Sequence, residues 1–136
     1  MSGKLLFTLP GHNASICSMA NHGSFISSGG DDGCSSLILW DSRTWTIKSR
    51  FQGHFAAITS IVDLKDGKHL VTGGFDSKIN IYNYKKGSLW LTCSSNKSKI
   101  TCMVLSADKL RLVSTGLDFS IFVWRLTYDR DSLSSM

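Results

Sequence analysis

Residues 70–82 read Leu70-Val-Thr-Gly-Gly-Phe-Asp-Ser-Lys-Ile-Asn-Ile-Tyr82: a short apolar segment, a hydroxyl residue, two glycines and an aspartate, then alternating apolar residues. The same order occurs twice more, as Ser28-Gly-Gly-Asp-Asp32 before Leu37-Ile-Leu-Trp40 and as Ser114-Thr-Gly-Leu-Asp118 before Ile121-Phe-Val-Trp124. Copies of one unit along a chain predict a repeat architecture.

The period of the repeat is 42 residues. Ile16, Ile58 and Ile100 are spaced by 42, and so are Trp40, Tyr82 and Trp124. Gly11-His12 and Gly53-His54 begin the first two copies, and each histidine stands 28 residues before its Trp or Tyr. The same count back from Trp124 reaches Asn96.

The segments between these markers have the composition of short strands. They are rich in Ile, Val, Leu, Thr and aromatic residues and are separated by Gly, Asp, Asn and Ser, while no stretch has helical periodicity. Asp66-Gly67 between two apolar runs indicates a hairpin. We predict strands at about residues 14–20, 24–28, 36–41, 45–51, 57–63, 68–73, 78–83, 88–93, 99–105, 111–115 and 120–126.

The period, the Gly-His start and the Trp-Asp end together resemble the WD-repeat β-propeller family. Trp40-Asp41 is a true Trp-Asp pair, and Tyr82-Asn83 and Trp124-Arg125 are degenerate copies. The resemblance implies an all-β fold of about three blades, each a four-stranded antiparallel sheet. The expected boundaries are residues 1–128 for the repeats, with blades at about 11–51, 53–93 and 96–126, and a polar tail at 129–136.

Three blades are fewer than a closed propeller of four to eight blades requires. The third copy has no evident fourth strand, and residues 4–9 have the pattern of a strand that closes the last blade of a ring. We therefore expect either that the chain is part of a longer propeller or that it completes a ring by association with other chains or with itself.

A Ser-His-Asp set in each copy could suggest a hydrolase. A set that recurs with the repeat is better explained by a repeated structural need, and in the family resembled it forms a hydrogen-bonded tetrad, so we expect no enzyme activity. The expected tetrad residues are His12, Ser28, Asp32, Trp40, His54, Thr72, Asp76, Tyr82, Asn96, Ser114, Asp118 and Trp124. Only the first set is complete, which predicts that Asp32 matters more for stability than Asp76.

The function that this resemblance implies is a non-catalytic scaffold for protein–protein interaction. Loops on a rigid scaffold commonly carry function, and Phe55 and Phe75 stand where polar residues are expected on a surface. The candidate partner-binding residues are Asn13, Asp31, Phe55, Phe75, Ser98 and Leu117.

Two other functions remain open. Trp40-Asp41-Ser42-Arg43 resembles the box found in substrate receptors of cullin-based ubiquitin ligases. The net charge of +5 could support binding to RNA or an anionic surface, but the Lys and Arg residues are scattered, so nucleic acid is an unfavoured partner.

The composition predicts an intracellular protein, cytoplasmic or nuclear. The cysteines Cys17, Cys34, Cys93 and Cys102 form no C-x-x-C pair, so we expect reduced thiols and no metal site. No segment has the length of a membrane span or the pattern of a signal peptide, and no motif indicates a cofactor. His22 and His69 are expected to be polar surface residues.

Overall fold

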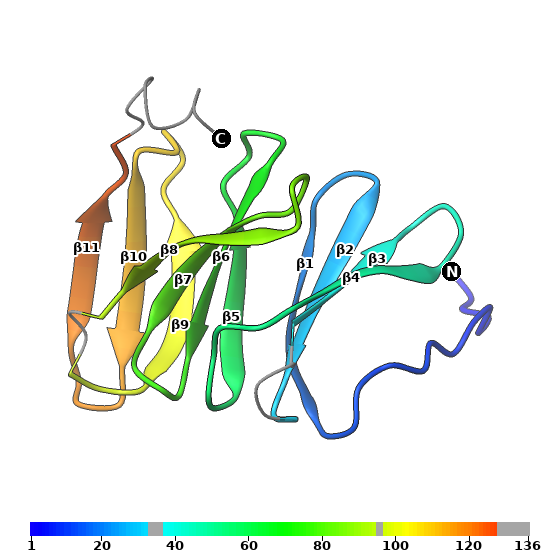
Figure 1. Ribbon diagram of the computed structural model, residues 1–136, viewed down its shortest axis with the longest axis horizontal. Helices are drawn as coiled ribbons and strands as arrows, with labels where there is room; N and C mark the ends of the chain where they lie inside the picture. The colour runs from blue at the N-terminus through cyan, green and yellow to red at the C-terminus, as the bar shows by residue number, and fades with distance from the viewer. Residues whose placement is uncertain (33–36, 95–96, 128–136) are drawn as a thin grey trace.

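The computed structural model describes residues 1–32, 37–94 and 97–127, which form eleven β-strands and no helix. The strands make three antiparallel sheets that stand side by side in an open row (Figure 1). We call the sheets blades 1, 2 and 3. Their strands are β1 (Ile16–Asn21), β2 (Phe25–Gly30), β3 (Leu37–Asp41) and β4 (Thr46–Phe51) in blade 1, β5 (Ile58–Asp63), β6 (His69–Gly74), β7 (Ile79–Asn83) and β8 (Ser88–Cys93) in blade 2, and β9 (Ile100–Leu105), β10 (Arg111–Gly116) and β11 (Ile121–Arg125) in blade 3.

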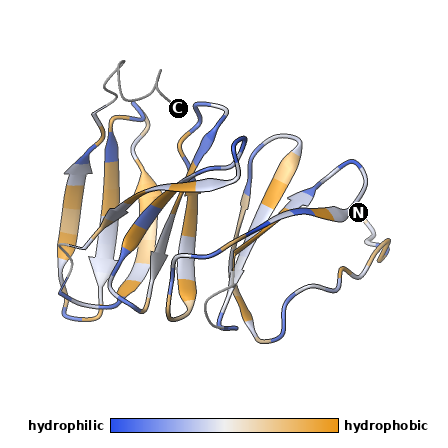
Figure 2. Ribbon diagram, in the orientation of Figure 1, coloured by the Kyte–Doolittle hydropathy of each residue, from blue (hydrophilic) through white to orange (hydrophobic). Residues whose placement is uncertain are grey.

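The prediction of an all-β fold built from propeller blades is confirmed. In each blade the strands pair with their neighbours in chain order, and β5 contacts β1 on one side and β9 on the other. Hydrophobic residues lie along the strands, whereas hydrophilic residues gather in many of the turns (Figure 2). Blade 3 contains three strands within the described residues.

A bulge occurs at the same point of every blade. The pairing register of the first strand with the second skips Cys17 in blade 1, Thr59 in blade 2 and Thr101 in blade 3. A bulge redirects the side chain of the unpaired residue. The Thr59 hydroxyl thereby reaches across to the next blade and donates a hydrogen bond to the Ile100 carbonyl oxygen at 2.6 Å.

The hydrophobic core lies between the blades. One cluster joins blades 1 and 2 and contains Leu37, Leu39, Phe51, Ile58, Ile61, Leu70, Tyr82 and Tyr84. A second cluster joins blades 2 and 3 and contains Leu64, Val71, Ile79, Ile81, Ile100, Met103 and Leu112. Each blade therefore depends on its neighbour to remove its apolar side chains from water.

Glycine permits the close approach of adjacent blades. A Cβ atom at Gly29 would lie 2.6 Å from Ile58 Cγ2, and one at Gly73 would lie 2.8 Å from Ile100 Cγ2. The repeated hydroxyl-Gly-Gly sequence thus places a residue without a side chain where the isoleucine of the next blade docks.

The expected Asp66-Gly67 hairpin joins β5 to β6. Gly67 has a φ of 80°, and the Asp66 carboxylate accepts hydrogen bonds from the backbone N–H groups of Lys68 and His69. Glycine adopts this backbone conformation without the steric cost that other residues meet, which explains the turn at this sequence.

Residues 4–9 form no strand in the single open chain, and their role as a closing strand of a ring stays a prediction. They lie beside blade 1, where the Phe7 ring is 6.1 Å from the Trp45 ring. Figure 1 shows β11 at the opposite end of the row of blades. A strand needs a hydrogen-bonding edge beside it, and within a single open chain the edge of blade 3 is out of reach.

The close contact at Gly29 predicts that even a methyl group is costly there. We expect Gly29→Ala to lower the free energy of unfolding by about 1–3 kcal/mol, since the new Cβ would overlap the side chain of Ile58. In an Ile58→Ala background the additional loss should shrink, because the clashing atoms are gone. Denaturant titration measures both, with Gly3→Ala as a neutral control; equal losses in the two backgrounds would contradict this packing.

Candidate functional site

The first His-centred set forms a continuous chain of hydrogen bonds. His12 Nδ1 lies 3.0 Å from an Asp32 oxygen, and His12 Nε2 lies 2.7 Å from Ser28 Oγ. A carboxylate only accepts, so Nδ1 carries the ring proton and the Ser28 hydroxyl donates to Nε2. Trp40 Nε1 then donates to Ser28 Oγ at 2.8 Å. The predicted residues are brought together, and their donors and acceptors match.

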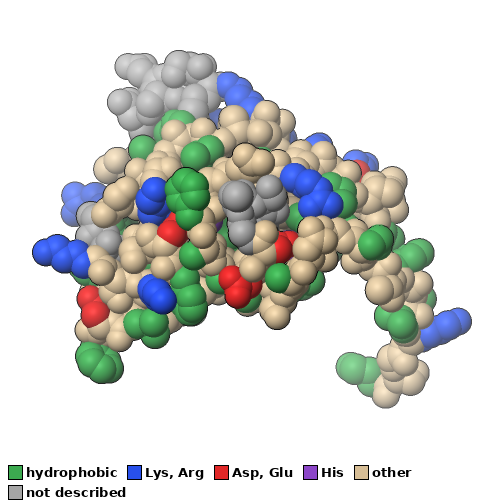
Figure 3. Space-filling model, turned by 60° about the horizontal axis from the view of Figure 1, so that its bottom comes forward, with side chains coloured by type: hydrophobic (Ala, Val, Ile, Leu, Met, Phe, Trp, Pro, Cys, Tyr) green, Lys and Arg blue, Asp and Glu red, His purple; other side chains and the backbone are tan. Residues whose placement is uncertain are grey.

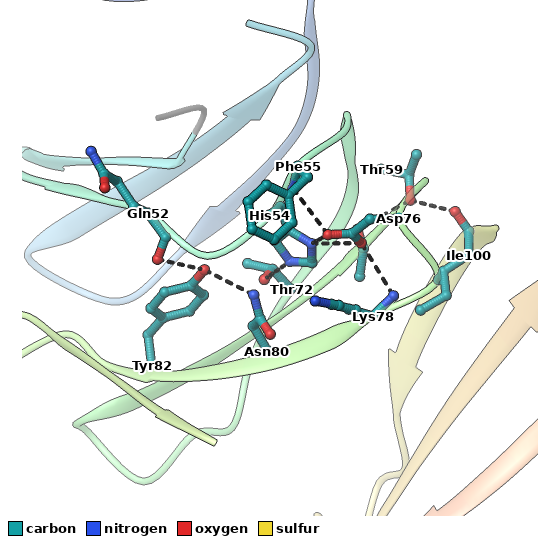
Figure 4. Close-up of polar contacts among 11 residues, drawn as sticks. Gln52, His54, Phe55, Thr59, Thr72, Asp76, Lys78, Asn80, Tyr82 and Ile100 are labelled. Atoms are coloured by element: carbon teal, nitrogen blue, oxygen red, sulfur yellow. Dashed lines mark hydrogen bonds and ion pairs between the residues drawn. The ribbon is translucent and has the colours of Figure 1, made fainter. Parts of the chain in front are cut away.

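The second set retains its histidine contacts, and the hydroxyl of its tyrosine also bonds to residues outside the set (Figure 4). His54 Nδ1 lies 2.9 Å from an Asp76 oxygen, and Nε2 lies 2.6 Å from Thr72 Oγ1. The Tyr82 hydroxyl accepts from the Asn80 side-chain amide at 3.2 Å and donates to the Gln52 carbonyl oxygen at 3.5 Å. The longer reach of a phenol thus directs the aromatic residue to different partners.

The third set keeps the indole contact, and two serines bond to its aspartate. Trp124 Nε1 donates to Ser114 Oγ at 2.9 Å. The Asp118 carboxylate accepts from the hydroxyl of Ser120, and the Asp118 backbone N–H donates to Ser98 Oγ at 3.1 Å. Asn96 lies outside the described residues. Serine side chains therefore hold this turn.

Asp32 and Asp118 are held in their ionised form. Burial raises the pKa of Asp32, but the Asn13 backbone N–H and the His12 side chain outweigh it, and the pKa ends below its ordinary value. The Ser120 hydroxyl is the main group that holds the pKa of Asp118 below its usual range. Ionised carboxylates accept stronger hydrogen bonds, so these turns keep their geometry at neutral pH.

This arrangement is unsuited to hydrolysis. A nucleophile must be accessible to its substrate, whereas Ser28 and Thr72 are buried. The Ser28 oxygen is also occupied by the Trp40 indole. The same side chains do serve to bind the loop that enters a blade to the inner strands of that blade.

The same carboxylates also position the backbone of the entering loops. The Asn13 N–H donates to Asp32 and the Phe55 N–H donates to Asp76, each at 3.1 Å. The Phe75 N–H donates to the Ala57 carbonyl oxygen at 2.9 Å. The loop that enters blade 2 and the turn from β6 to β7 are therefore hydrogen-bonded to each other in both directions.

These loops form a single surface, which we call the loop face. It contains the partner-binding residues predicted from the sequence, together with Lys78 and Lys99, which lie over the rings of Phe55 and Phe75. The residues of the loop face are Asn13, Asp31, Phe55, Phe75, Lys78, Ser98, Lys99 and Leu117. Hydrophobic, basic and acidic side chains are interspersed on this side of the molecule (Figure 3).

Phe55 is the most prominent of the predicted residues on the loop face. Its side chain is 75% exposed. Lys78 Nζ lies 5.1 Å from the Phe55 ring centre, and Lys99 Nζ lies 5.3 Å from that of Phe75. Ser98 is half-buried because its hydroxyl accepts from Asp118. Two aromatic rings, each with a lysine beside it, therefore lie in the accessible part of the site.

The Trp40-Asp41-Ser42-Arg43 segment lies at the other end of the strands. Asp41 accepts a hydrogen bond from the Arg43 backbone N–H at 2.8 Å, and Arg43 Nε is 3.8 Å from the same oxygen. The carboxylate therefore shapes the turn from β3 to β4, and the Arg43 side chain is exposed.

His22 and His69 are buried, and the expectation of surface positions was wrong. His22 Nε2 lies 2.6 Å from Ser27 Oγ, and its ring is 5.2 Å from the ring of Tyr84 in the next blade. His69 bonds to Asp66 and packs on the Trp90 ring at 4.9 Å. One signal could have revealed the burial of His22, because the residue 42 positions later is Leu64, a core residue.

Within the described residues, no group of three His, Cys, Asp or Glu side chains could hold a metal ion. No helix in this part of the chain is long and apolar enough to cross a membrane.

Comparison with known families finds a model described as "WD domain, G-beta repeat", which matches residues 3–41, 45–83 and 87–125. The second matched unit starts just before β4 and ends with β7, and the third starts just before β8 and ends with β11. In this frame, residues 3–10 occupy the place that β4 and β8 fill in the later units.

Curated proteins also match parts of this chain in sequence. The chain is 30% identical over 95 residues to "Periodic tryptophan protein 2" of Arabidopsis thaliana, an alignment that covers 68% of this chain and 11% of that protein. It is 32% identical over 94 residues to "UBP9-binding protein bun62" of Schizosaccharomyces pombe, covering 65% of this chain and 17% of that protein. The chain thus spans less than a fifth of the length of these relatives.

Among solved structures, the WD40 repeats of RRP9 superpose with a TM-score of 0.80 at 24% identity. The superposition covers 87% of this chain and 37% of the other. This likeness shows the fold of the blades.

The deeper burial of His54 bears on how much stability Asp32 and Asp76 each contribute. Asp76 accepts from His54 and from the backbone N–H groups of Phe55 and Lys78, and His54 is more deeply buried than His12. We therefore expect Asp76→Ala to cost at least as much stability as Asp32→Ala, about 1–3 kcal/mol for the unpaired groups left behind. Thermal melts would measure the losses, with Asp76→Asn as the control that keeps an acceptor. A larger loss for Asp32→Ala would restore the order expected from the sequence.

His22 predicts a dependence of stability on pH. Burial lowers its pKa below the ordinary value of 6.5, although Asp63 acts in the opposite direction. Below pH 6.5 the unfolded chain therefore binds a proton that the folded chain does not, and stability falls as the pH drops, by less than about 1.4 kcal/mol per pH unit for one proton. His22→Gln should flatten this part of the profile in urea titrations and leave the profile above pH 7 unchanged. Identical slopes below pH 6.5 in the two proteins would argue against this role.

Proposed function

Because the chain belongs to the WD40-repeat family, we propose that it is a non-catalytic scaffold that binds other proteins through its loop face. The observation that carries this proposal is the exposed Phe55 ring on a loop whose backbone is hydrogen-bonded to Asp76. An aromatic side chain held in water by an ordered loop is a typical anchor of protein interfaces.

The order of the loops supports binding in energetic terms. Association loses free energy when mobile loops and side chains become fixed. The loops at Phe55 and Phe75 already have their backbone N–H groups bonded to Asp76 and to Ala57. Binding of a partner would therefore lose little conformational entropy in these loops.

The chemistry of the loop face indicates the kind of contact. Phe55 and Phe75 provide apolar surface, and Lys78 and Lys99 place ammonium groups over these rings. A protein segment with an apolar side chain flanked by carboxylates would satisfy both features. The fission yeast relative is named as a protein that binds another protein, UBP9, which agrees with this class of function.

We expect the protein to act inside the cell. The described cysteines Cys17, Cys93 and Cys102 are free thiols, and free thiols persist in reducing compartments.

Affinity purification with the 136-residue chain as bait tests the proposal. Proteins retained by the unmodified chain should be lost with Phe55→Ala and with Phe75→Ala, and an identified partner should bind at least about tenfold more weakly to each variant. Leu89→Ala removes an exposed apolar side chain from β8, away from the loop face, and should retain the same proteins.

Two results would contradict the proposal. Unchanged binding to both phenylalanine variants would exclude the loop face as the binding surface. A steep loss of binding with salt, without an effect of the phenylalanines, would favour an anionic nucleic acid or lipid surface instead.

A further inference from the structure

The two ends of the row of blades present the same repeat positions that the internal interfaces bury. Ile58 and Ile100 dock against the preceding blade and are 1% exposed, whereas Ile16, the equivalent residue of blade 1, is 55% exposed. We call the side of blade 1 that contains Ile16 the rear face.

The opposite end shows the complementary pattern. Leu37 and Ile79 point toward the next blade and are 1% and 2% exposed, whereas Ile121, their equivalent in blade 3, is 70% exposed. Val123 is exposed in the same way. We call this side of blade 3 the front face.

The rear face already contains a hollow of about 230 Å³, lined in part by Ile16, Ile26 and Trp40. Leu112 and Trp124 stand at the positions of Ile26 and Trp40 in blade 3, and there side chains of blade 2 such as Ile79 and Trp90 complete the lining of a smaller hollow of about 130 Å³. The hollow therefore lies where a preceding blade would pack.

The front face also contains a hydroxyl donor, Thr101, at the position that Thr59 occupies in blade 2. Thr59 occupies the bulge of blade 2 and donates to the Ile100 carbonyl oxygen of blade 3. Thr101 occupies the same bulge in blade 3, and its hydroxyl bonds within its own blade to Thr115 at 2.8 Å. An approaching strand with a free carbonyl at this point could take the bond that Ile100 accepts inside the chain.

From these equivalences we propose that a second copy of this chain docks head to tail, with the front face of blade 3 in one copy packed on the rear face of blade 1 in the other. The contact repeats the geometry of the internal interfaces, with Ile16 in the place of Ile58 and Ile100. Two copies supply six blades, within the range in which propellers close. This inference is independent of the proposed role of the loop face.

Residues 3–10 fit this arrangement. They occupy the place of β4 and β8 in the repeat frame, yet they form no strand in the single chain. In the paired form they lie next to β11 of the other copy, where they supply the fourth strand of its blade 3. Closing that edge satisfies backbone groups that water would otherwise solvate.

Thr115 is the point at which the front face departs from the repeat. The equivalent residues Gly29 and Gly73 leave no room for a Cβ atom against the next isoleucine. The Thr115 side chain therefore weakens the contact with Ile16 of the other copy. Its removal in Thr115→Gly should tighten the association and free the Thr101 hydroxyl.

Sedimentation equilibrium of the 136-residue chain across micromolar concentrations tests the proposal. We expect a species of twice the chain mass whose population rises with concentration. Ile16→Asp and Ile121→Asp each place a carboxylate on one face and should raise the dissociation constant at least about tenfold. Leu89→Asp introduces the same charge on the middle blade and should leave association unchanged. Both target residues are exposed in the single chain, so circular dichroism should show that these variants fold.

Mixing the variants determines the mode of packing. The Ile16→Asp chain keeps its front face and the Ile121→Asp chain keeps its rear face, so head-to-tail packing predicts that the two associate with each other although neither self-associates. Thr115→Gly should bind several-fold more tightly than the unmodified chain. A chain that remains monomeric, a mixture that does not associate, or a Thr115→Gly variant that binds no more tightly would overturn the proposal.

Discussion

The structure depends on one constraint, which is that both faces of each blade are apolar and must be covered. The chain meets it by docking an isoleucine of one blade against a glycine of the blade before it, at Ile58 on Gly29 and at Ile100 on Gly73. The absence of a Cβ at the glycine sets how closely the sheets approach, and the buried clusters on either side follow from that approach. The same constraint leaves apolar residues in water at the two ends of the row, where no blade of this chain stands.

The histidine-centred hydrogen bonds serve this packing by attaching loops to strands. Blade 1 uses a full chain of donors from Trp40 to Asp32, whereas blade 2 keeps the histidine links and sends the Tyr82 hydroxyl to other partners. Blade 3 ties its turn with serines. The turn with its aspartate is therefore conserved in geometry across the three copies while the supporting side chains differ.

The interface between blades 1 and 2 contains a polar cluster at a place where the interface between blades 2 and 3 is apolar. His22, Asp63 and Tyr84 meet between blades 1 and 2, and the equivalent positions between blades 2 and 3 are Leu64, Leu105 and Leu126. Burial, together with the charges of Asp63 and Asp66, raises the pKa of Tyr84 to about 12. The phenol therefore stays neutral, and His22, whose pKa is lowered by burial, is the group in this cluster that acid would protonate. The interface between blades 1 and 2 responds to acid at a point where the other interface is apolar.

The sequence by itself determined the repeat, the strands and the side chains that meet around His12 and His54. These features depend on local alternation and on a period of 42 residues, and both can be counted along the chain. Tertiary structure alone decided the burial of His22, the partners of Tyr82 and the state of residues 4–9. Each of these depends on which surface lies opposite: another blade covers His22, Gln52 reaches Tyr82, and Phe7 packs beside Trp45 without strand pairing. The repeat pattern specifies which residues each blade contains. Whether a given face of a blade is covered depends on its neighbour, so Ile58 is buried while its equivalent Ile16 is exposed.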